Sequence, residues 1–345
     1  MKRRKHVTMK DVAQKAGVSS STVGRVVGGY GYVSEKTRKK VLKAMKEIGY
    51  YPNAIARSLK TSRTQTIAYL VPNITNPFFS QIANSIEHVA SSNEYNLILC
   101  NASTKGDKLR KITNMLLENR VAGVIHSLPC TDALYNLVEI FQRANIPVVS
   151  ASGSRRFSEV DTVCADDTQG AKDATGFLVE LGHSRIGFLG VKNSTTSRLR
   201  LQGYKEALLQ TDCKLNEEYI VEGSSFSEKE GYILMRTLLR KDSPPTAVLA
   251  CNDVMAVGAI RAIKEESLSI PEDISLIGFD DTIARLTHPP LTSVALPVEE
   301  IGRVATQTLF ERIEEVNKTA VRKVLLQERL VVRESTSQPY KNKDK

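Results

Sequence analysis

The segment AGVSSSTVGRVV, residues 16–27, sets three serines, a threonine and an arginine beside a run of valines. Gly17 is expected to end a first helix that begins after Thr8, and Ser19 restarts the chain as the N-cap of a second. The second helix then carries its valines on one side and its hydroxyl groups, with Arg25, on the other. The segment therefore predicts two short amphipathic helices joined by a tight turn.

A third helix is expected from Ser34 to a stop at Gly49, with apolar residues at helical spacing. Two helices joined by a Gly-Val-Ser turn are typical of a helix-turn-helix unit, whose second helix enters the major groove of DNA. Its hydroxyl groups would meet base edges, and Arg25 would reach a guanine or a phosphate. A run of helix caps and solvent-facing serines is the alternative interpretation.

Charge is divided unequally along the chain. Residues 1–63 contain 16 Lys and Arg against three acids, whereas the remaining residues contain 32 bases and 35 acids. A cationic segment followed by a near-neutral remainder favours a polyanionic partner. Solvated basic faces are also common in small domains, so the charge supports nucleic-acid binding without requiring it.

Several motifs follow one another along nearly the whole chain: TMKDVA, YVSEKTR, IGYYPNAIARSL, PNITNPFFS, TSRLRLQGY, CNDVMAVGAI, ISLIGFDD, PPLTSV and LVVREST. Together they resemble the LacI/GalR family of transcription regulators. The resemblance implies a small all-α helix-turn-helix headpiece and two doubly wound, parallel-sheet α/β subdomains of the periplasmic-binding-protein type. There are departures: Gly24 replaces a usual serine, Gly28 a common asparagine, and Ser152-Gly153 a frequent Asp-Arg pair. Without the serine, the helix is expected to make one phosphate contact fewer.

Residues 53–60, NAIARSLK, lie between the headpiece and the α/β remainder. This stretch is shorter than the ~12–15 residues that make an isolated helix marginally stable, so it is expected to fold only against a partner. The resemblance makes it a hinge helix that pairs with a second copy in the minor groove, where a leucine wedges between base pairs. A flexible linker is the alternative. The residues expected to contact DNA are Thr8, Ser19, Ser20, Ser21, Thr22, Arg25, Tyr50, Asn53, Ala56, Arg57 and Leu59.

From about residue 65, short apolar runs alternate with amphipathic segments. This pattern is typical of parallel strands covered by helices on both faces. The strand-like segments TSVALP and LQERLVVRE are expected to return to the first and second blocks in turn. The predicted organisation is a headpiece over 1–52, a hinge and linker over 53–64, a first subdomain over 65–163 and about 294–322, a second over 164–290 and about 323–338, and a tail over 339–345.

Polar residues follow the predicted strands, where open α/β sheets bind their ligands. Carboxylates and amides can hydrogen-bond to adjacent hydroxyl groups, and an aromatic ring can cover the apolar face of a sugar. Any single one of these residues could equally be a turn or a helix cap. The resemblance implies an effector pocket lined by Asn76, Phe78, Arg198, Phe226, Asn252 and Asp280, with Arg198 as a clamp for a carboxylate, a phosphate or vicinal hydroxyls.

Little in the sequence suggests an enzyme. It contains no HExxH, Walker or GxSxG motif, GGYGYV follows a helix instead of a strand, and its five histidines and five cysteines are scattered. No catalytic residue, metal or cofactor is therefore expected. The apolar runs are shorter than the ~20 residues of a membrane span, and the basic start lacks the apolar stretch of a signal peptide, which favours the cytoplasm.

The expected function is that of a sequence-specific transcription regulator, acting as a repressor. It would bind a palindromic double-stranded DNA operator as a homodimer, under the control of a small-molecule effector such as a sugar or sugar derivative. One alternative is a sugar-binding protein without a gene-regulatory role, which the two α/β blocks alone would fit. Another is a sugar-processing enzyme with an accessory DNA-binding domain.

Overall fold

The computed structural model divides into two compact units, residues 1–64 and 65–345. It describes residues 7–28, 30–50, 64–102, 107–151, 159–211, 213–314 and 320–339. The expectations for Asn53, Ala56, Arg57 and Leu59, and for Ser152-Gly153, lie outside the described residues. Among the described helices, none combines the length and the apolar character that crossing a membrane requires.

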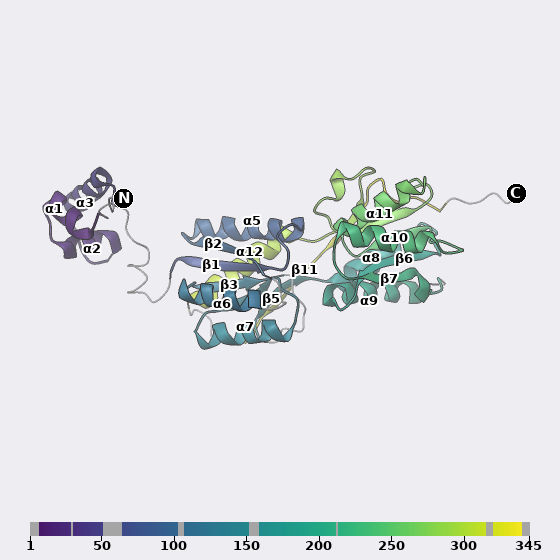
Figure 1. Ribbon diagram of the computed structural model, residues 1–345, viewed down its shortest axis with the longest axis horizontal. Coiled ribbons are helices and arrows are strands. Elements are labelled where there is room, and N and C mark those ends of the chain that lie inside the picture. The colour runs from purple at the N-terminus through teal and green to yellow at the C-terminus, as the bar shows by residue number, and fades with distance from the viewer. Residues whose placement is uncertain are drawn as a thin grey trace. The chain divides into compact units, whose positions relative to one another are not determined.

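The described part of the first unit consists of α1 (Met9–Ala16), α2 (Ser20–Gly28) and α3 (Glu35–Ile48), shown in Figure 1. Ser34 caps α3 by accepting from the backbone N–H of Thr37. Gly17 and Gly49 follow α1 and α3 with φ of 64° and 65°, a conformation that glycine adopts without strain. Small aliphatic side chains fill the core between the helices: Val12, Ala13, Ala16, Val23, Val26, Val41 and Ala44. The three helices predicted from the sequence are confirmed.

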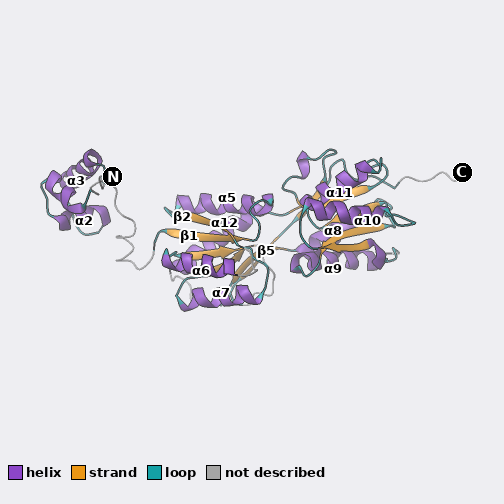
Figure 2. Cartoon of the chain, viewed as in Figure 1, coloured by secondary structure: helices purple, strands orange, loops and turns teal. Residues whose placement is uncertain are grey.

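The second unit contains two six-stranded sheets, each with helices on both faces (Figure 2). The first sheet has the order β11-β5-β4-β3-β1-β2, and all its paired neighbours are parallel. Its strands are β1 (Thr66–Val71), β2 (Asn96–Asn101), β3 (Gly123–His126), β4 (Val148–Ala151), β5 (Asp161–Ala165) and β11 (Lys323–Leu326). Its helices are α5 (Pro77–Ser92), α6 (Asp107–Glu118), α7 (Asp132–Arg143) and α12 (Val298–Ile313).

Alternation along β1 explains why the first sheet is covered on both sides. Ile67, Tyr69 and Val71 pack with residues of α5 and α12, whereas Ala68 and Leu70 belong to a second cluster with residues of α6 and α7. Successive side chains of a strand point to opposite faces, so an unbroken apolar strand needs helices on both.

The second sheet has the order β12-β10-β9-β8-β6-β7 and is parallel except for β12, which runs antiparallel to β10. Its strands are β6 (Ile186–Val191), β7 (Ile220–Gly223), β8 (Ala247–Ala250), β9 (Ser275–Asp280), β10 (Thr292–Ala295) and β12 (Arg329–Val331). Two helix pairs cover it: α8 (Asp167–Glu180) with α9 (Thr195–Leu209), and α10 (Glu228–Leu239) with α11 (Asp253–Glu265). The predicted pair of doubly wound parallel-sheet subdomains is confirmed.

The assignment of the last strands to the two sheets corrects the predicted boundaries. β10 pairs with β9 in the second sheet, although the pattern of TSVALP predicts a return to the first. β11 pairs with β5 in the first sheet, although the predicted second subdomain includes the residues from 323 onward, and β5 itself continues to Ala165. An apolar pattern shows that a strand is buried, but the choice of sheet depends on partners far away in sequence. The chain therefore passes between the sheets after β5, after β10 and after β11.

Candidate DNA-reading helix and effector site

The exposed side of α2 carries the polar groups that the sequence singled out. Ser20, Ser21 and Arg25 are exposed or partly exposed and Thr22 is half-buried, whereas Val23 and Val26 face the core. Ser19 has a different role, because its Oγ accepts from the backbone N–H of Thr22 at 3.1 Å and lies 2.8 Å from the hydroxyl oxygens of Ser21 and Thr22. Ser19 therefore caps the helix, and the residues after it form the exposed surface.

Thr8 and Tyr50 lie at the two ends of the headpiece. The backbone N–H and the hydroxyl of Thr8 both donate to Oδ2 of Asp11 at 2.7 Å, which fixes the start of α1. Tyr50 is half-buried and packs against the headpiece core after α3. Both residues stabilise helix ends, and their contacts with DNA stay a prediction.

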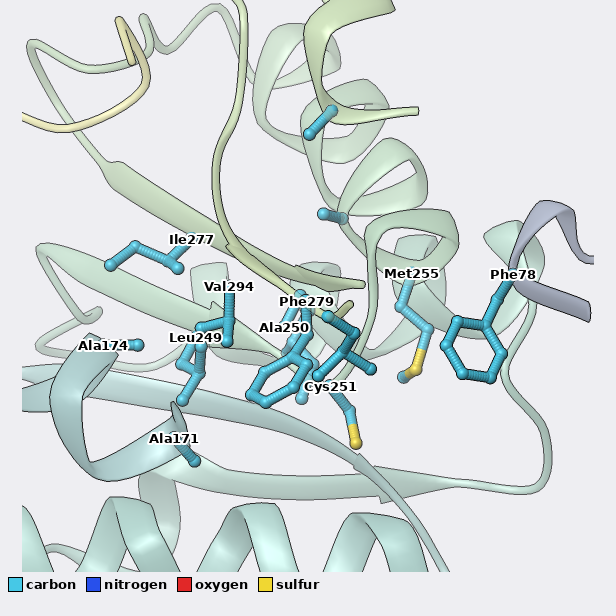
Figure 3. Packing of buried hydrophobic residues seen from close by; sticks show 14 of the residues in the cluster. Phe78, Ala171, Ala174, Leu249, Ala250, Cys251, Met255, Ile277, Phe279 and Val294 are labelled. Carbon is cyan, nitrogen blue, oxygen red and sulfur yellow. The ribbon is translucent and has the colours of Figure 1, made fainter. Parts of the chain in front are cut away.

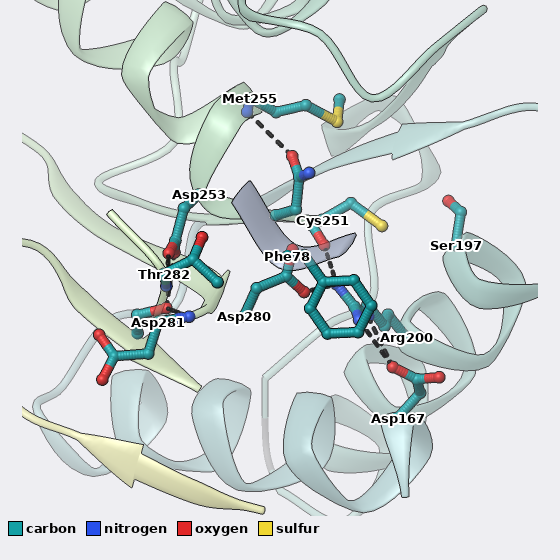
Figure 4. A network of polar contacts seen from close by, with 12 residues as sticks. Phe78, Asp167, Ser197, Arg200, Cys251, Asp253, Met255, Asp280, Asp281 and Thr282 are labelled. Atoms are coloured by element: carbon teal, nitrogen blue, oxygen red, sulfur yellow. Dashed lines mark hydrogen bonds and ion pairs between the residues drawn. The ribbon is translucent and has the colours of Figure 1, made fainter. Parts of the chain in front are cut away.

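A buried arginine is the centre of the polar network in the second unit (Figure 4). Arg200 lies on α9 and is 4% exposed. Its Nε donates to Oδ1 of Asp167 at 2.9 Å, and its Nη2 forms an ion pair with the same oxygen at 2.8 Å. Its Nη1 donates to Oδ1 of Asp280 at 3.2 Å and to the carbonyl oxygen of Cys251. The guanidinium carbon lies 3.6 Å from the centroid of the Phe279 ring, so the cation is held in one orientation.

Two carboxylates share this one cation. Burial raises the pKa of Asp280 to about 7, although the nearby guanidinium of Arg200 opposes the shift. Burial also disfavours the charge on Arg200, but Asp167 and Asp280 outweigh that cost and keep its pKa above the usual range. The cation therefore already has its anionic partners, and further hydrogen bonds to the network would be made mainly to carboxylate oxygens.

The structure does not bring Arg198 to this network. Arg198 is exposed, whereas Arg200, two residues later on α9, is buried. Two residues turn an α-helix by about 200°, so the two arginines lie on opposite sides. The geometry therefore favours Arg200 over the predicted Arg198 as the arginine of the effector site. A signal was present in the sequence, because Arg200 shares helical spacing with Gly203, Tyr204 and Ala207, which are buried on α9.

The two predicted asparagines begin helices that follow strands. Asn76 accepts from the backbone N–H of Phe78 at 3.0 Å to cap α5, and Asn252 accepts from that of Met255 at 2.9 Å to cap α11. Both side chains are buried. The alternative interpretation of these residues as helix caps is therefore correct, and any contact with an effector would come in addition.

Phe78 connects the first subdomain to the core of the second. It is 5% exposed and belongs to one apolar cluster with Cys251, Met255 and Phe279. Figure 3 shows its ring beside the Met255 side chain. Phe226 is half-buried before α10 and packs against the outside of the same cluster. The structure thus gathers Phe78, Asn252 and Asp280 near Arg200 and leaves Phe226 at the border of the cluster.

The turn after β9 separates two neighbouring acids. Asp280 accepts from Arg200, whereas Oδ2 of Asp281 accepts from Nη2 of Arg333 at 2.9 Å and its Oδ1 lies 2.7 Å from Nη1 of the same arginine. The two neighbouring carboxylates therefore have different arginine partners. Both acids have positive φ, 95° and 54°, a conformation that costs a non-glycine residue energy. Asp253 holds the turn, because its carboxylate accepts from the hydroxyl of Ser293 and the backbone N–H of Thr282.

Sequence reasoning missed the importance of three members of this network. Asp167 is one of several acids that follow a predicted strand, and no sequence motif distinguishes Arg200 or Phe279. Phe279 reads as an ordinary strand residue, and only the fold shows that the guanidinium of Arg200 covers its ring. Within the described residues, no group of three His, Cys, Asp or Glu side chains is arranged to hold a metal ion.

Two family models match the chain. Residues 8–53 match the model for bacterial regulatory proteins of the lacI family, and residues 175–336 match a periplasmic binding protein-like domain. The ribose operon repressor of Haemophilus influenzae is 38% identical over 332 residues, which cover 95% of this chain and 98% of that protein.

Solved structures agree with these matches. The lac repressor dimer bound to operator has a TM-score of 0.85 at 30% identity, and the match covers 96% of this chain and 100% of that one. A LacI family transcriptional regulator from Enterococcus faecium with bound ribose has a TM-score of 0.70 at 32% identity, covering 79% and 99% of the two chains.

The three-helix headpiece, the two linked parallel sheets and these matches all point to one family. The relatives include a ribose operon repressor, a lac repressor dimer bound to operator and a transcriptional regulator with bound ribose, and the likeness to the first two extends over nearly the whole chain. The protein belongs to the LacI family of bacterial transcription regulators.

Proposed function

We propose that this regulator is a repressor whose effector is a small, neutral, hydroxyl-rich molecule, with a pentose such as ribose as the first candidate. The observation that carries the proposal is the pairing of Arg200 with both Asp167 and Asp280. An anionic ligand would compete with two carboxylates for one cation, whereas sugar hydroxyl groups can donate to carboxylate oxygens. The name of the Haemophilus influenzae relative and the ribose bound to the Enterococcus faecium relative support the same class of ligand.

We assign the effector contacts to Arg200, Asp280 and Asn252 from the second subdomain, and to Asn76 and Phe78 from the first. All five side chains are at least nine-tenths buried. Because the contributors come from both subdomains, ligand binding would favour one angle between them. The three chain passages between the sheets would act as the joints of this motion.

We assign DNA reading to Ser20, Ser21, Thr22 and Arg25 of α2, with two copies of the chain on a palindromic operator. The hinge residues Asn53, Ala56, Arg57 and Leu59 and the cytoplasmic location stay predictions from the sequence. A change of angle between the subdomains would alter the spacing of the two hinges and hence the affinity for DNA. We expect no catalytic turnover of the effector, since the relatives are repressors. The headpiece argues against a sugar-binding protein without a regulatory role.

Differential scanning fluorimetry of the full-length protein tests the ligand class. The panel is ribose, ribose 5-phosphate, ribonic acid and a free nucleobase, each measured with the wild type, Arg200→Met and Arg198→Met. Ribose or another neutral sugar should raise the melting temperature of the wild type and of Arg198→Met, but not that of Arg200→Met. Stabilisation by the phosphate or the acid alone would contradict the neutral-ligand proposal.

A further inference from the structure

The turn between α2 and α3 lays a tyrosine ring along the recognition helix. A Cβ atom built on Gly28 would lie 2.4 and 2.6 Å from the Cε1 and Cδ1 atoms of Tyr30, which is closer than atoms can approach. A Cβ atom on Gly24, one turn earlier, would lie 3.6 Å from the hydroxyl oxygen of Tyr30. The ring therefore occupies the space over Gly28, and its hydroxyl extends back toward Gly24.

This ring continues the exposed polar surface of α2. Ser21, Gly24 and Gly28 are spaced three and four residues apart, so they share one side of the helix. Ser21 is exposed, and 46% of Tyr30 is exposed. On the same side, the Cδ atom of Arg25 lies 3.5 Å from where a Cβ of Gly31 would stand, so a second residue of the turn approaches the helix.

The two glycines need an explanation, because glycine is a poor helix former and α2 has only nine residues. Neither Gly24 nor Gly28 has the positive φ that would require glycine for the backbone. At Gly28 the requirement is space, since any side chain there would displace the ring. At Gly24 the hydroxyl of Tyr30 lies close to where the serine usual in the family would begin.

We infer that Tyr30 is a DNA-recognition residue supplied by the turn, and that Gly28 leaves the space that seats its ring on the groove-facing side of α2. Its hydroxyl, which can donate or accept, would reach a base edge from the side of α2 where a serine side chain at position 24 would otherwise stand. The inference rests on the DNA reading proposed for α2 and extends it to a residue outside the helix. The competing possibility is that the ring only shields and stabilises the end of α2.

The test uses the full-length protein and its preferred DNA. Duplexes are first selected from a random library by the wild type, and equilibrium binding to the selected duplex and to an unrelated one is then measured. Tyr30→Phe keeps the ring and removes the hydroxyl, while Gly28→Ala places a methyl group inside the ring's space. Gly176→Ala is the matched control, because Gly176 is a helical glycine of α8 with nothing within 4 Å of its Cβ position.

Tyr30→Phe should lose about two- to tenfold affinity for the selected duplex, the worth of one hydrogen bond, and none for the unrelated duplex. Gly28→Ala should lose a similar factor, and the double variant should be no weaker than the weaker single one, because both changes remove the same contact. Gly176→Ala should match the wild type. A repeated selection with Tyr30→Phe should relax the preference at one base pair of each half-site.

Unchanged affinity and unchanged selected sequences for Tyr30→Phe would overturn the inference and leave the ring a structural role only. Equal weakening toward both duplexes would also overturn it, because a general attraction carries no sequence information. If Gly28→Ala fails to fold, Tyr30→Phe alone decides. Failure of the wild type to select any duplex would instead overturn the proposed DNA reading itself.

Discussion

The headpiece and the second unit, residues 65–345 and hereafter the α/β body, present their polar groups in opposite ways. On α2, Ser20 and Ser21 stand exposed on a support of small aliphatic residues. In the body, Arg200 and Asp280 are 4% and 6% exposed and bound to each other. A DNA duplex is a large polyanion that binds to the protein surface. The side chains that contact it can therefore be solvent-exposed before binding. A small molecule is enclosed, so its contacts must be oriented and paired in advance.

Removal of the buried cation tests this difference most strongly. Arg200→Ala should lower the free energy of unfolding of the body by about 3–5 kcal/mol, because two buried carboxylates lose their partner. Arg198→Ala, two residues away on the exposed side of α9, should change it by less than ~0.5 kcal/mol. Urea unfolding of both variants measures the difference. Equal losses of unfolding free energy in the two variants would contradict the stabilising role of the contacts between Arg200 and the two carboxylates.

Acidification separates the two regions by their histidines, because the described headpiece residues contain none. In the body, burial lowers the pKa of His126 to about 4. The unfolded chain binds this proton near pH 6.5, so between pH 7 and pH 4 the unfolded state gains a proton that the folded state excludes. The contribution of His126 to the free energy of unfolding should therefore fall by about 3 kcal/mol over that range.

The variant His126→Asn isolates this contribution, and His88→Asn on the exposed side of α5 is its control. Unfolding free energies are compared with the wild type at pH 7 and pH 4. The loss on acidification should be smaller in His126→Asn and unchanged in His88→Asn. The same acid sensitivity in all three proteins would contradict the assignment.

Within the headpiece, two neighbouring serines should respond differently. Ser19→Ala should cost about 1 kcal/mol of headpiece stability, because the backbone N–H of Thr22 loses its acceptor. Ser20→Ala should leave stability within ~0.5 kcal/mol and weaken binding to the selected duplex. Thermal unfolding and DNA titration of the two variants separate the capping role from the reading role. Equal effects of the two variants on stability would remove that distinction.

The same contrast explains what could be predicted from the sequence. The three headpiece helices were predictable because their signals are local: Ser19 and Ser34 accept from backbone N–H groups three residues away, and Gly17 follows its helix directly. The alternation of strands and helices in the α/β body could also be predicted, because the apolar and amphipathic patterns are local. The helix-turn-helix pattern and the basic charge then indicated DNA binding, and the resemblance added the family.

Strand pairings and side-chain contacts between distant parts of the sequence could not be predicted from such local signals. Only long-range pairing places β10 beside β9 and β11 beside β5. The choice between Arg198 and Arg200 required the phase of α9, and the pairing of Arg200 with Asp280 joins residues 80 positions apart. The role of Tyr30 depends on two glycines that looked like simple losses in the sequence.

The most direct test of the account is the dissociation constant for the selected duplex, measured with and without the stabilising sugar. The wild type and Arg198→Met should change their dissociation constants by about 5- to 150-fold, the range typical of coupled sites. Arg200→Met should bind the duplex as the ligand-free wild type does and show no change when the sugar is added. A response of Arg200→Met equal to that of the wild type would contradict the assignment of effector sensing to this buried network.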